Sequence, residues 1–213
     1  MPSLPARSSP GPRPTRIRRV GSEDARRRQL IEATIESIAE LGFNATTIAV
    51  IARRANVSTG LVAFYFGDKD GLLEATLRHL ARELSRGVAV RLRDAVTPRD
   101  RIQAIIDANL GASQFDRRIA TVWLAFWGQV PHSPRFARVQ RTYQQRIATN
   151  LAHALRALVD RDEAWRRAEA IASLIDGLWL RATLARVPNG RSAREIASAF
   201  VDAELNLLER PSP

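Results

Sequence analysis

The segment Thr46–Lys69 is the feature that most constrains how this 213-residue chain can fold. Its pattern predicts a short helix, a tight turn at Asn56 and a second short helix capped by Ser58. Asparagine tolerates the left-handed backbone that such a turn needs. Two helices joined by a turn of about three residues can place the second helix in the major groove of DNA. The segment therefore predicts a DNA-binding helix-turn-helix.

The rest of the chain is helical in pattern, with apolar residues at helical spacing and no convincing strand. We expect an all-α protein of about nine helices. Two of them are the short helices within 46–66, and the others span about 24–41, 68–94, 98–113, 116–130, 134–159, 163–187 and 192–209.

This pattern divides the chain into three parts. Residues 1–21 contain five prolines and five arginines, which predicts a disordered tail. Such a tail either follows a DNA minor groove or is simply solvated. Residues 22–68 form the expected helix-turn-helix domain. The helix over 68–94 connects it to residues 69–210, the expected effector-binding and dimerisation domain.

Composition favours a nucleic-acid partner in a cytoplasmic, reducing environment. The formal net charge is +11, and residues 1–93 hold 16 basic and 9 acidic side chains, so the excess is greatest around the helix-turn-helix. Basic surfaces bind phosphate backbones through counterion release. The chain has no cysteine, which excludes disulfides and thiolate metal sites. Its longest strongly apolar stretch, 119–130, is too short for a membrane span. We expect no membrane contact, metal or cofactor.

Several side chains of the motif are candidates for contacting DNA. Hydroxyl groups can bond base edges or phosphates, and apolar groups can meet thymine methyls. Lys69 lies in the first turn of its helix, where its ammonium and the helix dipole both attract phosphate. Tyr65 suits either a phosphate contact or packing inside the domain, and Leu61 is expected to point inward. The candidate contacts are Thr46, Thr47, Ser58, Thr59, Gly60, Val62, Phe64, Tyr65 and Lys69.

Aromatic residues gather in the second half of the chain. Trp123, Phe126 and Trp127 stand at positions i, i+3 and i+4 of one expected helix, and Asp176 and Trp179 stand three apart on another. Aromatic faces bind quaternary ammonium cations, and a nearby carboxylate would suit the charge. The same stripe would also suit a packed core, and Asp176 would equally suit a helix cap, an ion pair with Arg181 or a dimer seam. The candidate ligand contacts are Trp123, Phe126, Trp127, Tyr143, Asp176 and Trp179.

Wide apolar faces on the last two expected helices predict a homodimer. Paired across a twofold axis they would make a four-helix bundle, although packing within one chain would also use such faces. Two DNA-binding domains would suit a near-palindromic site on double-stranded DNA. The candidate dimer contacts are Ile171, Ile175, Leu178, Phe200 and Leu205.

The helix-turn-helix resembles that of TetR-family transcriptional repressors. The resemblance rests on the patterns Ala52-x-x-Ala55-x-Val57-Ser58-x-Gly60 and Tyr65-Phe66-x-x-Lys69-x-x-Leu72. It implies a TetR-like all-α homodimer that binds a near-palindromic operator and a small-molecule effector. Three positions depart from the family pattern. Asn56 replaces the usual glycine, while Ala63 and Phe64 stand where relatives carry a phosphate-binding Tyr and a His or Tyr.

The second half of the chain resembles the choline-responsive members of that family. The matching segments are Trp123-Leu-Ala-Phe-Trp127 and Leu174-Ile-Asp-Gly-Leu-Trp-Leu-Arg-Ala182. They imply choline or a related quaternary ammonium compound as effector, and genes of choline and glycine-betaine metabolism as targets. The alternative is an unrelated hydrophobic or cationic drug or metabolite.

Two other functions compete with a ligand-responsive repressor. An all-helical enzyme is disfavoured because the sequence has no nucleophile elbow, phosphate loop or metal-ligand spacing. A ligand-independent architectural DNA binder is disfavoured by the tryptophan-rich second domain.

Overall fold

The computed structural model of the chain describes residues 16–185 and 189–208. Within these ranges it contains nine α-helices and no strand, which confirms the expected fold class. The helices are α1 (Arg16–Leu41), α2 (Ile48–Arg54), α3 (Thr59–Phe66), α4 (Lys69–Leu92), α5 (Pro98–Asn109), α6 (Arg117–Trp127), α7 (Pro134–Leu155), α8 (Arg161–Leu184) and α9 (Gly190–Leu208). Two short 3₁₀ segments, η1 (Ala112–Phe115) and η2 (Val130–His132), flank α6. Within residues 16–185 and 189–208, every helix is too short or too polar to span a membrane.

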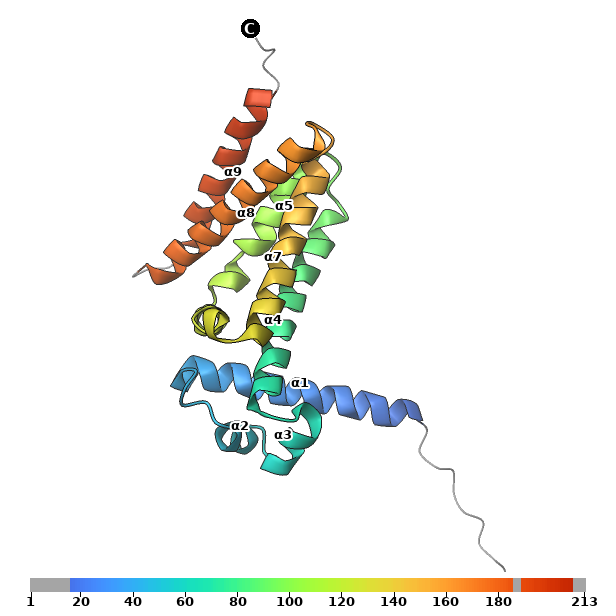
Figure 1. Cartoon of the computed structure of the whole chain (residues 1–213), viewed down its shortest axis with the longest axis vertical. Coiled ribbons are helices and arrows are strands. Elements are labelled where there is room, and N and C mark those ends of the chain that lie inside the picture. The colour runs from blue at the N-terminus through green and yellow to red at the C-terminus, as the bar shows by residue number, and fades with distance from the viewer. Residues whose placement is uncertain (1–15, 186–188, 209–213) are drawn as a thin grey trace, which may run out of the picture.

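Helices α1–α3 form a small domain, called the head below, at the lower end of the molecule (Figure 1). Its core contains Leu30, Ile38, Ile51 and Val62, all fully buried. Gly42 ends α1 with φ +81°, which is a left-handed backbone that glycine adopts without strain. The side-chain amide of Gln29 donates to the Ala55 carbonyl at 2.8 Å and so ties α1 to the end of α2.

The first helix begins earlier than the sequence pattern indicates. We expected a disordered tail over 1–21, but residues 16–21 continue α1. The reason is that the last proline of this region is Pro14, so nothing after it interrupts a helix. Residues 1–15, which hold the rest of the expected tail, lie outside the described residues.

Helix α4 connects the head to the larger domain, called the body below (Figure 1). Asp68 caps it by accepting a hydrogen bond from the Gly71 amide at 2.5 Å, as the sequence predicts. One face carries Leu73, Leu77 and Leu84 into the core along the whole helix. A single continuous helix therefore spans both domains.

The body packs α5 and α7 against α4, with α8 and α9 along its outer side (Figure 1). Thr97 and Asp100 form a reciprocal capping box at the start of α5, with Pro98 in the first turn. Helix α5 ends at Asn109, before the expected residue 113, because the chain turns into η1. An irregular turn therefore joins α5 to α6.

Two expected dimer contacts are wrong. Ile171 and Ile175 are 3% and 1% exposed within the single chain, because they face inward from α8. A side chain buried in this way offers no surface to a second copy. Leu178 and Leu205 are half-buried, and Phe200 is 37% exposed, so these three remain available.

The head meets the body through three phenylalanines. The ring centroid of Phe126 (α6) lies 5.8 Å from that of Phe43 in the head and 5.4 Å from that of Phe136 (α7), both edge to face. Around this cluster, Arg135 pairs with Asp68 at 3.3 Å. Arg118 and His79 each reach a Glu32 oxygen at 3.6 Å. The contact therefore has an aromatic centre and a polar border.

Candidate functional site

The turn between α2 and α3 has the left-handed backbone that its sequence predicts. Asn56 has φ +50°, and its amide donates to the Arg53 carbonyl at 3.1 Å. The Val57 amide donates to the Ala52 carbonyl at 2.9 Å. The Ser58 hydroxyl then caps α3 by accepting from the Leu61 amide at 3.3 Å. This geometry leaves Ser58, Thr59 and Gly60 exposed at the start of the helix that would read DNA.

The inward and outward faces of α3 differ from the expected ones. Val62, an expected DNA contact, is fully buried, whereas Leu61, expected to point inward, is only half-buried. A helix turns by about 100° per residue, so an error of one position is enough to confuse a buried residue with a half-buried one. Val62 is therefore a core residue, and the exposed apolar residues of α3 are Ala63 and Phe64. Phe64 is 78% exposed, which leaves its ring free for contact with DNA.

Thr46 is also a core residue rather than a phosphate contact. It is fully buried, and its hydroxyl donates to the Gly42 carbonyl at 2.8 Å. The cap of α2 is its neighbour Thr47, whose hydroxyl accepts from the Val50 amide at 3.2 Å and which is exposed. Of the two threonines, Thr47 is the one whose position suits a backbone phosphate.

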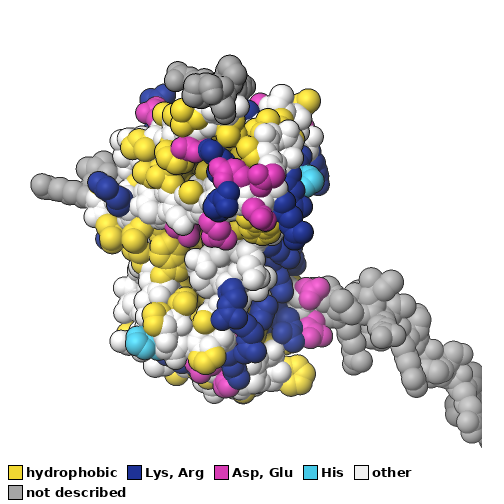
Figure 2. Space-filling model, turned by 45° about the horizontal axis from the view of Figure 1, so that its top comes forward, with side chains coloured by type: hydrophobic (Ala, Val, Ile, Leu, Met, Phe, Trp, Pro, Cys, Tyr) yellow, Lys and Arg dark blue, Asp and Glu magenta, His cyan; other side chains and the backbone are white. Residues whose placement is uncertain are grey.

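Lys69 and Tyr65 are both half-buried beside other side chains. Lys69 is the first residue of α4, and its Nζ lies 5.8 Å from the Phe43 ring centroid. Tyr65 is half-buried, and its ring lies 5.4 Å from the Arg27 guanidinium. Packing therefore holds the Tyr65 ring without excluding a phosphate contact by its hydroxyl. Figure 2 shows Lys and Arg side chains in a band that runs down one side of the body toward the head, with hydrophobic side chains gathered on the opposite side.

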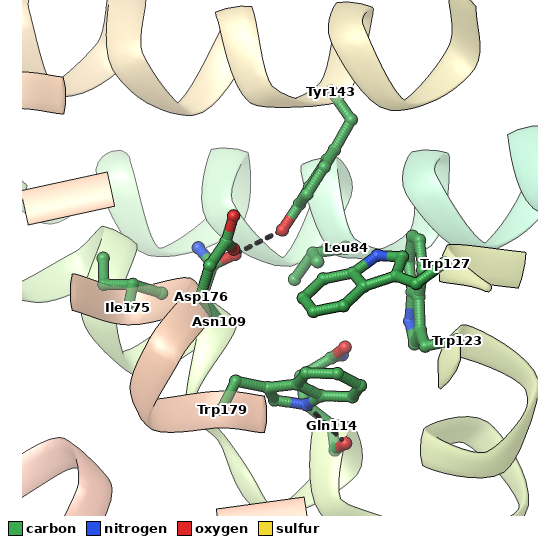
Figure 3. A pocket seen from close by; sticks show the side chains of 9 residues that line it. All are labelled: Leu84, Asn109, Gln114, Trp123, Trp127, Tyr143, Ile175, Asp176 and Trp179. Carbon is green, nitrogen blue, oxygen red and sulfur yellow. Dashed lines mark hydrogen bonds between the residues drawn. The ribbon is translucent and has the colours of Figure 1, made fainter. Parts of the chain in front are cut away.

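A small cavity of about 20 Å³ lies inside the body (Figure 3). Helices α4 to α8 and η1 contribute to its wall. No lysine or arginine is among its lining residues. They are Leu84, Asn109, Gln114, Trp123, Trp127, Tyr143, Ile175, Asp176 and Trp179.

Four aromatic rings face one another around this cavity. The ring centroids of Trp127 and Trp179 lie 4.9 Å apart at an interplanar angle of 61°. Those of Trp123 and Tyr143 lie 5.8 Å apart at 35°. The structure thus brings together four of the five aromatic residues that the sequence analysis named as ligand contacts. We call Trp123, Trp127, Tyr143 and Trp179 the aromatic cage.

Hydrogen bonds help to orient two rings of the cage. The Tyr143 hydroxyl donates to Asn109 Oδ1 at 2.7 Å (Figure 3). The Asn109 amide in turn donates to the Ile105 carbonyl at 2.8 Å. The Trp179 indole N–H donates to the Gln114 carbonyl at 3.0 Å. Two of the four rings are therefore held by polar partners as well as by packing.

Asp176 supplies the one ionisable carboxylate of the cavity wall. Burial raises the pKa of this carboxyl from its ordinary value to about 6, and the nearby Gln144 amide offsets only part of the effect. Burial also raises the pKa of the Tyr143 hydroxyl well above its ordinary value, and the negative charge of Asp176 adds to this shift. The cavity therefore holds a charge that a cation would stabilise.

Phe126 does not belong to the cage. It is fully buried in the contact between head and body, beside Phe43 and Phe136. Positions 123, 126 and 127 of a helix span an arc of about 100°, which is wide enough for its two edges to meet different partners. The expected ligand contact at Phe126 is therefore wrong.

The sequence analysis missed several cavity residues. Asn109 carried a signal, because it is a polar residue in line with the apolar stripe of Ile102, Ile105 and Ile106. Leu84 and Ile175 were indistinguishable from other core residues. Gln114 contributes a backbone carbonyl from η1, which no side-chain pattern reveals. Among the described residues, no group of three or more His, Cys, Asp or Glu side chains is placed to hold a metal ion.

A helix-turn-helix head joined by one long helix to a larger helical body is the architecture of a transcriptional regulator. Comparison with known families agrees. Residues 30–76 match the family described as "Bacterial regulatory proteins, tetR family". Residues 98–206 match the family described as "BetI-type transcriptional repressor, C-terminal".

Individual relatives give the same assignment. The HTH-type transcriptional regulator BetI of Stenotrophomonas maltophilia is 44% identical over 187 residues, covering 87% of this chain and 95% of that protein. A transcriptional regulator from Pseudomonas aeruginosa is 28% identical, with a TM-score of 0.77 over 86% of this chain and 91% of its own. One from Saccharomonospora viridis, solved in complex with choline, has a TM-score of 0.71 at 23% identity, covering 84% and 96%. The chain belongs to the TetR family and has a BetI-type C-terminal domain, which makes it a DNA-binding repressor and not an enzyme.

We expect Lys69 and Thr59 to respond differently to substitution. Lys69→Ala should weaken binding to all duplexes alike and reduce the slope of log affinity against log salt by about 0.9, the value of one phosphate contact. Thr59→Ala should instead change the ranking of operator variants, because base contacts carry the discrimination. Fluorescence anisotropy with a panel of variant duplexes at several salt concentrations measures both. An unchanged ranking for Thr59→Ala would remove Thr59 from the base-reading residues.

Proposed function

We propose that this repressor controls genes of choline and glycine-betaine metabolism and that choline or a related quaternary ammonium compound releases it from its operator. The observation that carries the proposal is the cavity itself. Four aromatic rings and one carboxylate line it, and its wall contains no basic side chain. That combination suits a small organic monocation.

The chemistry of the cage matches such a ligand. Each aromatic face within about 6 Å of a quaternary ammonium contributes roughly 0.5–2 kcal/mol, the larger values applying to desolvated sites. Asp176 adds an opposite charge at one side of the cavity. A ligand that also carries a carboxylate, such as glycine betaine, would bring a second negative charge into the same poorly solvated space. The cavity therefore favours choline over glycine betaine.

The relatives support the same effector. The C-terminal domain is of the BetI type, and the Saccharomonospora viridis regulator of the same fold was solved with choline. Release from DNA requires that the ligand bind one conformation better than another. Helix α6 offers a direct route, since it carries Trp123 and Trp127 in the cage and Phe126 in the contact with the head.

A homodimer would present two heads to a near-palindromic operator. The outer side of α8 and α9 supports this arrangement, because large apolar side chains remain exposed there. They are Leu184 (66%), Ile196 (50%), Phe200 (37%) and Leu207 (58%), with Leu178 and Leu205 half-buried beside them. An apolar surface of this kind on a regulator is typical of a subunit interface.

The direct test is a gel shift on DNA from upstream of the gene, with and without choline. We expect choline at millimolar concentration to release the complex, and glycine betaine at the same concentration to do so much less. A complex that forms but is unaffected by choline would contradict the proposed effector. An unrelated cationic drug that leaves the complex intact while choline releases it would support choline as the effector. Release by the drug but not by choline would favour the alternative effector.

Removing one ring of the cage should weaken choline binding. We expect Trp127→Leu to lower the affinity by about 2- to 30-fold, the equivalent of one cation–π contact. Isothermal titration calorimetry measures the affinity. Trp165→Leu is a matched control, since Trp165 is a half-buried tryptophan on α8 that does not line the cavity. Equal losses for both variants would argue that the rings act only through packing.

Choline affinity should depend on pH through Asp176. The pKa of its carboxyl is raised to about 6, so the carboxylate is mostly ionised at pH 8 and mostly protonated at pH 5. Because choline keeps its charge throughout, its affinity should fall about tenfold as pH drops from 8 to 5. Asp176→Asn should bind more weakly at pH 8 and show little change with pH. A wild-type affinity that is flat between these values would exclude Asp176 as the counter-charge.

A charge on the outer side of α9 should separate the subunits. We expect Phe200→Glu to sediment as a monomer and to bind operator DNA more than tenfold more weakly, because one head makes half the contacts. Val96→Glu introduces the same charge at a residue that is 88% exposed outside α8 and α9, and it should change neither property. Sedimentation velocity and anisotropy measure the two effects. A dimeric Phe200→Glu protein would relocate the interface.

A further inference from the structure

A buried polar atom of the cage has no partner. Four buried side-chain atoms in the described part of the chain lack a hydrogen bond: Arg101 Nε, Trp127 Nε1, Gln140 Oε1 and Thr183 Oγ1. Trp127 is the one of these four residues that lines the cavity. Its indole nitrogen is therefore a buried, unused donor on a residue that lines the proposed effector site.

The other polar groups of the cage already have partners. The Trp179 N–H donates to Gln114, and the Tyr143 hydroxyl donates to Asn109. Asn109 in turn uses its amide on Ile105. Buried polar groups in folded proteins are nearly always hydrogen-bonded, so the free N–H of a cavity residue is a candidate donor to a bound ligand.

The chemistry of the indole restricts that partner. An indole N–H donates and cannot accept, so the ligand must supply an acceptor atom. A carboxylate oxygen is disfavoured by Asp176 in the same wall. A neutral oxygen, as in a hydroxyl or an ether, meets both conditions.

We propose that Trp127 Nε1 donates a hydrogen bond to a neutral oxygen of the effector and thereby selects quaternary ammonium ions that carry such an oxygen over plain tetraalkylammonium ions. This inference rests on the proposed function. Trp127 then has two roles in the site: its ring contacts the cation, and its N–H donates to the oxygen of the substituent. The cage alone would bind both classes of ion.

Two pairs of ligands isolate the oxygen. Choline is compared with propyltrimethylammonium, in which a methyl replaces the hydroxyl. The methyl ether of choline, (2-methoxyethyl)trimethylammonium, is compared with butyltrimethylammonium, in which a methylene replaces the ether oxygen. By calorimetry we expect the oxygen-bearing member of each pair to bind wild-type protein about five- to tenfold more tightly. The ether matters because it can accept a hydrogen bond but cannot donate one.

Two variants assign the preference to one nitrogen. Trp127→Phe keeps an aromatic ring and removes the N–H, so we expect both affinity ratios to fall below twofold. Trp179→Phe also removes an N–H, but one that is already bonded to Gln114, so the ratios should persist. In addition, the ¹⁵N–¹H signal of the Trp127 indole should move downfield with choline and much less with propyltrimethylammonium. This measurement uses wild-type protein and does not depend on the folding of a variant.

The outcomes separate this inference from the proposed function. Failure of all four ions to bind folded protein would overturn the proposed effector class. Tight binding of all four without preference would leave the cage intact and overturn the donor role of Trp127. A preference for choline without one for the ether would mean that the effector hydroxyl donates instead of accepting, which also overturns it. Persistence of both ratios in Trp127→Phe would assign the oxygen to another group.

Discussion

The edge-to-face packing of Phe126 against Phe43 and Phe136 holds the DNA-binding head on the body. The ion pairs around it lie near the surface, where such pairs contribute about 0–1 kcal/mol each. Burial of aromatic rings is larger and more specific in geometry, so this cluster does most to fix the orientation of the head. The placement of α3 relative to the body, and with it the spacing of two heads in the proposed dimer, therefore depends on this contact as well as on α4.

The cavity contains a carboxylate whose burial is unfavourable, together with aromatic rings that can bind a cation beside it. A partly buried carboxylate loses hydration, and the raised pKa of Asp176 expresses that cost. The same carboxylate, placed beside four aromatic rings, gains most from a cation that has little hydration to lose. At neutral pH the ionised carboxylate is thus only partly compensated by its hydrogen bond with Gln144. The free energy of relieving this condition is available to favour the conformation that binds ligand.

The sequence was sufficient for the element order and for most of the cage, because strong periodicity and rare residue types mark both. It failed where one helical position decides the outcome. Thr46 and Thr47 both suit a cap, and only the start of α2 shows which one is buried. Leu61 and Val62 are chemically alike, so periodicity in an eight-residue apolar helix could not choose between them. Ile171 and Ile175 face the body instead of a partner, because an apolar stripe does not reveal what covers it.

The shortness of α6 has a mechanical consequence. Its 11 residues form about three turns, roughly 16 Å in length, and a helix of that size moves as a rigid rod instead of bending. The rings that contact the cavity and the ring that contacts the head lie within one turn of each other. A rotation of the rod that lets Trp123 and Trp127 close on a ligand would turn Phe126 by the same angle against Phe43. Communication between the cavity and the head then needs no chain of intermediate residues. A substitution that only changes how α6 is rotated about its axis would alter the effect of ligand on DNA binding, while the residues of both binding surfaces stay the same.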